Sequence, residues 1–254
     1  MLIENISVVL IVKDAQKTIK NTLDSLKDFK EVIVYENNST DNTVLIVKDY
    51  VNVKLYQGDF LGFGKTKNKA ISFSSNDWVL SLDSDEVLSE EFVKSLKDLK
   101  LDSKKVYKIH RKNYYKQKLV KYCWSDDFIV RLFNKKKVSY NDSDVHEKVI
   151  YKGFESEVLS GEVKHYPYSN MSDFIKKADY YSTLFAKNQV SKKSSSPLKA
   201  FFNATYSFLR TYVIKRGFLD GYVGLVIAVS HAMTNFYKYI KLYELNLEQK
   251  NKKD

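Results

Sequence analysis

Three carboxylates fall within four residues at the end of an apolar run, where Asp83, Asp85 and Glu86 follow residues 78–82. Side chains two positions apart on an extended strand share a face, so we expect Asp83 and Asp85 to point the same way, roughly 6 to 7 Å apart. Mg²⁺ and Mn²⁺ prefer carboxylate oxygens and complete their shells with phosphate oxygens and water. The Asp-x-Asp pair therefore indicates a clamp for a metal-bound diphosphate, such as a nucleotide-sugar carries.

The acidic cluster has an ordinary alternative, because acidic residues after a strand also serve in turns and as helix N-caps. Ser89 precedes an amphipathic segment with Phe92 and Leu96 on its apolar face. We therefore expect Ser89 to cap a helix there. That leaves residues 83–86 in the loop before this helix, available to a ligand.

Length and composition indicate a folded protein with one substantial core, or one domain with an appended subdomain. The chain has 254 residues, 44% of them hydrophobic, and only two prolines and eight glycines, which argues against a linker-rich or fibrous architecture. Cys123 is the single cysteine, so an intramolecular disulfide and a thiolate metal cluster are excluded and a reducing compartment is favoured. The first residues lack the pattern of a signal peptide, and we expect cytoplasmic residence.

Charge is distributed unevenly along the chain. Residues 1–103 carry 13 Lys and Arg against 17 Asp and Glu, whereas residues 104–254 carry 29 against 14. A nucleic acid, an anionic membrane surface and a phosphorylated lipid acceptor all suit a basic second half. Solvated lysines without a partner are the plain alternative.

In residues 1–103, apolar runs of strand length alternate with segments whose apolar residues recur at helical spacing. This alternation predicts βαβ units and a parallel sheet buried on both faces. Ligands bind beyond the carboxyl ends of strands in such sheets, and the polar motifs of this half follow strands. The expected strands are residues 6–12, 31–35, 53–56 and 78–82.

Beyond residue 103 the pattern predicts shorter strands and then helices. The expected strands are residues 106–111, 128–133 and 145–151, with a hairpin turn at 135–137, and the expected helices are residues 170–190, 198–215 and 219–245, the last two separated around Gly217.

Residues 221–237 contain no Lys, Arg, Asp or Glu, and basic residues flank them. This length lies at the bottom of the membrane-spanning range, and Ser230 and His231 lower the hydrophobicity. We expect a helix that lies at a membrane surface rather than one that spans it. A helix buried against the protein's own core is the alternative.

Four segments of the first half carry a resemblance: residues 12–14 (Val-Lys-Asp), 36–41 (Glu-Asn-Asn-Ser-Thr-Asp), 62–68 (Gly-Phe-Gly-Lys-Thr-Lys-Asn) and 78–86 (Trp-Val-Leu-Ser-Leu-Asp-Ser-Asp-Glu). With them the chain resembles the family-2 inverting glycosyltransferases of the GT-A fold, and within that family the lipopolysaccharide-core glucosyltransferases that act on inner-core heptose. Similar segments in the second half are residues 131–133, 145–147, 180–182, 216–221 and 238–244.

The resemblance implies an α/β fold: a GT-A (Rossmann-like) nucleotide-diphospho-sugar transferase sheet with a C-terminal helical extension. Residues 1–168 would form the glycosyltransferase domain, with a nucleotide-binding half in residues 1–103 and an acceptor-side half in 104–168. Residues 169–247 would form a helical, membrane-associating region. Residues 248–254 would be a frayed tail.

The resemblance also assigns roles to residues. Asp83 and Asp85 would hold Mg²⁺ or Mn²⁺, with His165 as a third ligand, and the metal would neutralise the departing nucleoside diphosphate. Glu36 stands where the family usually has Asp, so the base or ribose contact there would carry one more methylene. The residues expected to bind the nucleotide-sugar are Val12, Asp14, Glu36, Asn38, Lys67, Asn68, Asp83 and Ser84.

An inverting transfer also needs a general base that accepts the proton of the acceptor hydroxyl. Glu147, which follows His146 in the matched segment, is the preferred candidate. Asp126 and Asp127 are the alternatives, because sequence does not supply the geometry that decides a general base.

The activity implied is metal-dependent transfer of a hexose, glucose from UDP-glucose, to a lipid-linked lipopolysaccharide or lipooligosaccharide core at the inner face of the cytoplasmic membrane. Transfer to capsule or glycoprotein glycan intermediates is the alternative within the family. Two other classes differ in kind. A basic nucleic-acid-binding module would explain only the charge of the second half, and a glycoside hydrolase with paired carboxylates would leave the Gly62-x-Gly64 loop unexplained.

Overall fold

The computed structural model describes residues 2–124, 127–142 and 147–251, and the chain divides into two compact units. The first unit comprises Met1–Lys112 and Asp126–Tyr166, and the second comprises Asn113–Ser125 and Pro167–Asp254. Each unit buries apolar side chains of its own, so each has a separate core.

A parallel sheet forms the N-terminal half of the first unit. Its strands lie in the order β3-β2-β1-β4, and they are β1 (Ile3–Val12), β2 (Phe29–Glu36), β3 (Val53–Gln57) and β4 (Trp78–Asp83). The four strands expected in residues 1–103 are thus confirmed. Val12 is in register with Glu36, and Ile11 with Asp83, so the strands end at a common edge.

The sheet continues with antiparallel strands. β8 (Asp127–Asn134) pairs with β4 and is followed by β6 (Lys105–Tyr115), β11 (Glu155–Tyr168) and β5 (Glu86–Leu88). The acidic cluster is more ordered than the sequence suggested. Asp83 is the last residue of β4, and Glu86 is the first residue of β5, which pairs with β11. Only Ser84 and Asp85 lie in the turn between the two strands.

The strand expected at residues 145–151 is shorter than predicted. Strand structure is limited there to β10 (Val149–Ile150), which pairs with β9 (Ser139–Tyr140), and residues 143–146 lie outside the described part of the chain. Residues 135–137 form a turn as expected, but it is not a hairpin turn, because β8 pairs with β4 and β6 whereas β9 pairs with β10.

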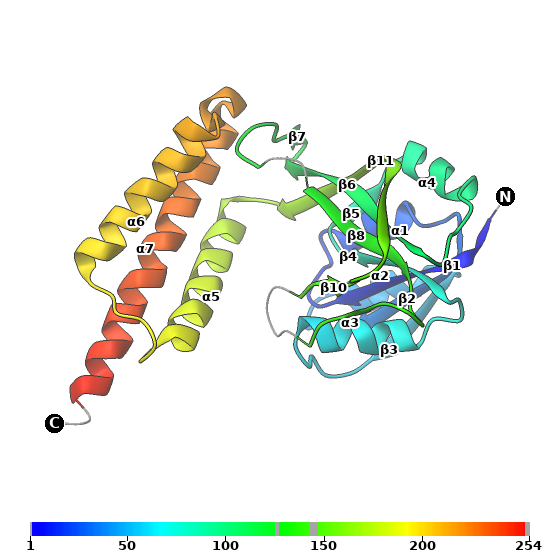
Figure 1. The fold of residues 1–254 in the computed structure, drawn as a ribbon, viewed down its shortest axis with the longest axis horizontal. Coiled ribbons are helices and arrows are strands. Elements are labelled where there is room, and N and C mark those ends of the chain that lie inside the picture. Colours follow the sequence, from blue (N-terminus) through cyan, green and yellow to red (C-terminus); the bar gives the residue numbers. More distant parts are fainter. Residues whose placement is uncertain (1, 125–126, 143–146, 252–254) are drawn as a thin grey trace. The chain divides into compact units, whose positions relative to one another are not determined.

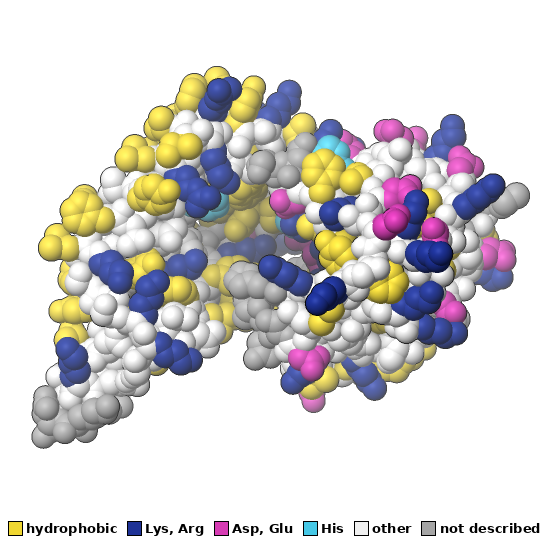
Figure 2. All heavy atoms as spheres, viewed as in Figure 1, with side chains coloured by type: hydrophobic (Ala, Val, Ile, Leu, Met, Phe, Trp, Pro, Cys, Tyr) yellow, Lys and Arg dark blue, Asp and Glu magenta, His cyan; other side chains and the backbone are white. Residues whose placement is uncertain are grey.

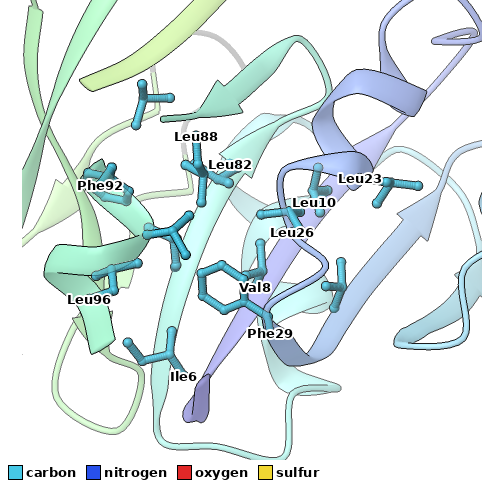
Figure 3. Packing of buried hydrophobic residues seen from close by; sticks show 14 of the residues in the cluster. Ile6, Val8, Leu10, Leu23, Leu26, Phe29, Leu82, Leu88, Phe92 and Leu96 are labelled. Carbon is cyan, nitrogen blue, oxygen red and sulfur yellow. The ribbon is translucent and has the colours of Figure 1, made fainter. Parts of the chain in front are cut away.

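Four helices cover the sheet: α1 (Ile19–Asp24), α2 (Thr43–Lys48), α3 (Phe63–Ser72) and α4 (Glu90–Lys97). Ser89 caps α4 as expected, since its hydroxyl accepts a hydrogen bond from the Phe92 backbone N–H at 3.2 Å. Figure 3 shows Leu10, Phe29 and Leu82 packed with side chains of these helices. A second cluster that includes Val9, Ile33 and Ala70 completes the burial of the sheet.

The second unit is mainly helical and also contains the ends of β6 and β11 and the short β7 (Lys118–Leu119). It contains α5 (Met171–Gln189), α6 (Pro197–Leu209), the π-helix η1 (Arg210–Ile214), the 3₁₀-helix η2 (Gly217–Asp220) and α7 (Tyr222–Asn251). α7 packs against both α5 and α6 (Figure 1). α7 continues to Asn251, so residues 248–251 are helical rather than frayed.

The break around Gly217 is confirmed and has a local cause. Arg216 adopts the left-handed conformation, with φ 56°, and ends the preceding helical run. A Cβ on Gly224 would lie 1.7 Å from the carbonyl oxygen of Gly217, so glycine at position 224 is required for this close approach.

Asp220 ties a loop of the second unit to η2. Its buried carboxylate accepts hydrogen bonds from the backbone N–H groups of Lys121, Tyr122 and Cys123 at 2.9, 3.1 and 3.0 Å. Sequence reasoning noted Asp220 only as part of a matched segment, and the structure gives it an architectural role.

No helix in the described residues is both long enough and apolar enough to cross a bilayer. In the segment 221–237, Val223, Ile227 and Ala228 are fully buried in the second unit, whereas Leu225 and Val229 are exposed.

Candidate active site

The loops after β1 and β2 are joined by hydrogen bonds at the carboxyl edge of the sheet. The Asp14 carboxylate accepts from the Thr40 backbone N–H at 2.7 Å, and the Asp14 N–H donates to the Ser39 hydroxyl at 2.9 Å. Asp14 and Asn38 both have positive φ, 48° and 56°, which short polar side chains tolerate. The Val12 side chain is buried. Its backbone carbonyl, at the edge of the sheet, accepts a hydrogen bond from the Asn37 N–H at 2.8 Å.

Glu36 is buried at the end of β2, with 1% of its surface exposed. Its carboxylate accepts from the Ser39 backbone N–H and from the Gln57 amide, the latter at 3.0 Å. Burial raises the pKa of Glu36, but the hydrogen bonds from Ser39 and Gln57 outweigh it and the net shift is downward. Glu36 therefore holds the loop after β2 in place through Ser39, and its charge is retained at neutral pH.

A chain of alternating charges runs through the centre of the first unit. Lys67 on α3 donates to Asp83 at 3.0 Å and to Glu147 at 2.7 Å. Arg131 on β8 donates to the other Asp83 oxygen and, at 3.0 Å, to the fully buried Glu86. Asp83 is thus held between two cations.

The chain of charges continues on the other side of Glu86. Arg111 on β6 donates to Glu86 at 3.1 Å and to Asp127 at 2.8 Å. We call the seven residues the charge chain; in order they are Glu147, Lys67, Asp83, Arg131, Glu86, Arg111 and Asp127. Burial raises the pKa of Asp83, but Arg131 and Lys67 hold it well below the usual range, so Asp83 is ionised.

A pocket of about 460 Å³ opens onto this chain. Asp83, Arg131 and Glu147 line it together with Arg111 and Tyr140, whereas Asp127 is not among its lining residues. The buried Nε atoms of Arg111 and Arg131 have no hydrogen-bond partner among the described residues. The pocket therefore combines carboxylates with guanidinium groups, the residue type that best matches phosphate geometry.

Two of the three expected metal ligands lie together. Nε2 of His165 is 3.6 Å from Oδ1 of Asp85, and burial lowers the pKa of His165 to about 4, so its imidazole is neutral at pH 7. The carboxylate oxygen suits Mn²⁺ or Mg²⁺, and a neutral imidazole nitrogen is a common metal ligand. Asp83 does not fit as the third ligand in this arrangement, because Lys67 and Arg131 engage its oxygens. Within the described residues no three Asp, Glu, His or Cys side chains gather as a metal group.

The other predicted residues fall in different places. The Asn68 side chain pairs with the backbone of Tyr140, donating at 2.9 Å to its carbonyl and accepting at 3.0 Å from its N–H, so it positions β9. The Ser84 carbonyl accepts from the Thr22 hydroxyl at 3.0 Å. Asp126 and His146 lie outside the described residues.

Sequence reasoning missed the roles of three members of the charge chain: Glu86, Arg111 and Arg131. Glu86 was noted as a carboxylate and Arg131 as part of a matched segment, but neither observation gives a partner. The available signal was Arg131 within the expected strand 128–133, which is otherwise apolar, since a buried arginine requires an acidic partner.

Comparison with known proteins gives the family. Residues 7–151 match the family model described as glycosyl transferase family 2. A glycosyltransferase of Rickettsia typhi is 30% identical over 98% of this chain and 90% of its own length. A lipopolysaccharide core biosynthesis glycosyltransferase, LpsC of Rhizobium meliloti, is 25% identical over 94% of this chain and 92% of its own.

A crystal structure of TarS 1–349 from S. aureus aligns over 98% of this chain and 92% of that chain, with 16% identity and a TM-score of 0.46. The mixed α/β unit with a helical C-terminal region confirms the fold class expected from the sequence. The matched residues cover most of the first unit, from β1 to Tyr151, which is the last residue in the sequence to line the pocket. The chain belongs to glycosyl transferase family 2.

Proposed function

We propose that this glycosyltransferase moves a hexose, glucose from UDP-glucose, to a lipopolysaccharide or lipooligosaccharide core acceptor with inversion at the anomeric carbon. The relative LpsC, whose name assigns it to lipopolysaccharide core biosynthesis, is similar over nearly the whole of both chains and supports this acceptor class. The resemblance of residues 62–68 and 78–86 to core glucosyltransferases supports the donor.

The observation that carries the proposal is the shared pocket of Glu147 and Asp83. Lys67 Nζ joins the two carboxylates, and all the groups belong to the first unit. An inverting transfer needs one carboxylate near the acceptor hydroxyl and a separate charged region near the diphosphate. The pocket supplies both within one cavity.

Glu147 is the proposed general base. Its carboxylate accepts the proton of the acceptor hydroxyl while that oxygen attacks the anomeric carbon from the face opposite the leaving group. The bond between the anomeric carbon and the diphosphate oxygen breaks, and the electron pair leaves with the nucleoside diphosphate. Lys67 donates to the Glu147 carboxylate at 2.7 Å and so orients it within the pocket.

Arg131 and Arg111 are the proposed groups that receive the diphosphate side of the donor. Their guanidinium groups are fixed by Glu86, which is fully buried and ionically paired with both. Fixed cations stabilise the negative charge that develops on a departing diphosphate without reorganising in the reaction.

Asp85 and His165 are the proposed ligands of a divalent cation. When bound, Mg²⁺ or Mn²⁺ would supply Lewis-acid stabilisation of the diphosphate. Their side chains fit this role by type and by proximity, whereas Asp83 stays with Lys67 and Arg131. The proposal thus narrows the expected ligand set to Asp85 and His165.

A lipid-linked acceptor places the proposed reaction at the inner face of the cytoplasmic membrane. The basic charge of the second unit supports association with an anionic surface.

The direct test is an assay with radiolabelled nucleotide-sugars and lipid-linked core acceptors, with and without EDTA. We expect transfer of glucose from UDP-glucose, inverted product stereochemistry by NMR, and loss of activity with EDTA that Mn²⁺ restores. No transfer from any common nucleotide-sugar would overturn the proposal, and transfer to a protein or capsule intermediate instead of a core acceptor would overturn the acceptor assignment.

A further inference from the structure

One side of the second unit exposes large apolar side chains along α6 and η1. Phe201, Phe202 and Tyr206 are 58%, 63% and 60% exposed. We call the stripe they belong to the α6 edge; its members are Leu198, Phe201, Phe202, Tyr206, Leu209 and Val213. Figure 2 shows hydrophobic side chains gathered over this helix.

The α6 edge is a helical face and not a scatter of single residues. Leu198, Phe202, Tyr206, Leu209 and Val213 follow one another at spacings of three or four, and Phe201 lies three residues after Leu198. The six side chains therefore cover one side of the helix, while Ala200 on the opposite side is fully buried. Six such side chains at about half to two-thirds exposure leave on the order of 600 Å² of apolar surface, at the upper end of what monomeric proteins expose. A patch of this size indicates a partner.

The charge of the second unit indicates what kind of partner. The second unit carries 17 Lys and Arg against 6 Asp and Glu, whereas the first carries 25 of each, so the entire net charge of +11 belongs to the second unit. Arg210, Lys215 and Arg216 are exposed at the end of the α6 edge.

Negative charge is absent from the exposed surface of this region. Asp220 is the one acidic residue in positions 180–243, and its carboxylate is buried and engaged by backbone N–H groups. An apolar stripe bordered by cations alone is complementary to a surface that is apolar within and anionic at its boundary.

We propose that the α6 edge is a docking surface for an anionic lipid bilayer, with its aromatic and aliphatic side chains inserted at the headgroup boundary. A second copy of the chain is a poor occupant, because positions 180–243 present no exposed acidic side chain that could pair with Arg210 and Lys215 of the other copy. Since no described helix is able to span a bilayer, the contact is interfacial.

This proposal moves the membrane contact from residues 221–237, which the sequence favoured, to α6. Val223 and Ile227 of α7 are fully buried in the core of the second unit and are not available to lipid. The proposal stands on exposure and charge, so it does not depend on which sugar is transferred.

The test is flotation of the full chain with vesicles of phosphatidylcholine alone and of phosphatidylcholine with phosphatidylglycerol. We expect binding to the anionic vesicles that weakens as salt is raised. Phe201→Ser with Phe202→Ser should weaken it about tenfold or more, since each removes a large apolar insertion. Arg210→Gln with Lys215→Gln should also weaken it about tenfold, because each basic residue near an anionic surface contributes severalfold.

Leu45→Ser with Val51→Ser is the matched control, since both side chains are exposed on the first unit, and it should bind like the wild type. If circular dichroism shows that the double variant Phe201→Ser with Phe202→Ser does not fold, the flotation of Leu198→Ser with Tyr206→Ser is measured in its place. Wild type that fails to float with anionic vesicles, or edge variants that float as well as wild type, would overturn the proposal. A dimer seen by light scattering that the Phe pair dissociates would overturn it in favour of a second copy.

Discussion

Nζ of Lys67 lies 2.7 Å from Oε1 of Glu147, although the two residues are 80 positions apart in the chain. The same ammonium group reaches Asp83, so one buried cation joins the candidate base to the carboxylate at the end of β4. With 4% of its side chain exposed, Lys67 is buried rather than solvated.

Lys67→Met removes the cation but keeps most of the side-chain volume. We expect a loss of transfer of about a hundredfold or more, because Asp83 and Glu147 then repel each other and lose their positions. The free energy of unfolding should fall by about 3 kcal/mol, since the change leaves buried charge unpaired. Steady-state kinetics and urea titration measure the two effects.

Lys65→Met is the control for this variant, because Lys65 is an exposed lysine on the same helix. Its activity and stability should match the wild type. Equal activity of Lys67→Met and Lys65→Met would contradict the role given to the charge chain.

Asp85 and His165 carry the proposed metal site, so their replacement should change metal dependence and not only the rate. Asp85→Asn and His165→Gln should each raise the Mn²⁺ concentration needed for half-maximal transfer by about tenfold or more. Titration of EDTA-treated protein with Mn²⁺ gives this value. A response to Mn²⁺ identical to wild type in both variants would remove these residues from the metal site.

We expect His231 to lower the stability of the second unit as the pH falls. Nε2 of His231 accepts from the Trp124 indole at 3.3 Å, and burial lowers the pKa of His231 to about 4. The unfolded chain, with a pKa near 6.5, binds the proton first. The contribution of neutral His231 to the free energy of unfolding is therefore complete above about pH 6.5. As the pH falls toward 4, the free energy of unfolding decreases by about 3 kcal/mol at most.

Urea titrations between pH 7 and pH 4 measure this loss, and His231→Gln should flatten it. A wild-type profile that is unchanged by the substitution would show that other groups control the acid response.

Gly224→Ala tests the contact between η2 and α7. A Cβ at this position would lie 1.7 Å from the Gly217 carbonyl oxygen, so the backbone must shift, and we expect destabilisation of about 3 kcal/mol. Leu225→Ala, at an exposed neighbouring position, is the control.

Cys123 reports the result of that substitution. Burial, with Asp220 nearby, raises the pKa of the Cys123 thiol to about 12, so a thiol reagent at pH 8 should react only when the second unit opens. Gly224→Ala should speed this reaction well above the wild-type and Leu225→Ala rates. Equal rates in all three proteins would mean that the contact contributes little.

Local features could be predicted from the sequence, and long-range pairings could not. The four parallel strands, the Ser89 cap and the break around Gly217 each follow from neighbouring residues, through apolar runs, a capping pattern and a glycine. Arg131 meets Asp83 and Glu86 across 48 and 45 positions, and nothing local signals those partners. The same limit explains why Asp83 was expected to hold a metal, although its oxygens face two cations.

The central claim is that Glu147, in the pocket of the charge chain, accepts the acceptor's proton, and Glu147→Gln tests it most directly. Donor affinity measured by calorimetry should change by less than about threefold, while the single-turnover rate of transfer should fall by about a thousandfold, because the amide accepts no proton. Asp127→Asn, which alters a carboxylate not among the pocket's lining residues, should retain most of the activity. Transfer at the wild-type rate by Glu147→Gln, with loss in Asp127→Asn, would contradict the account.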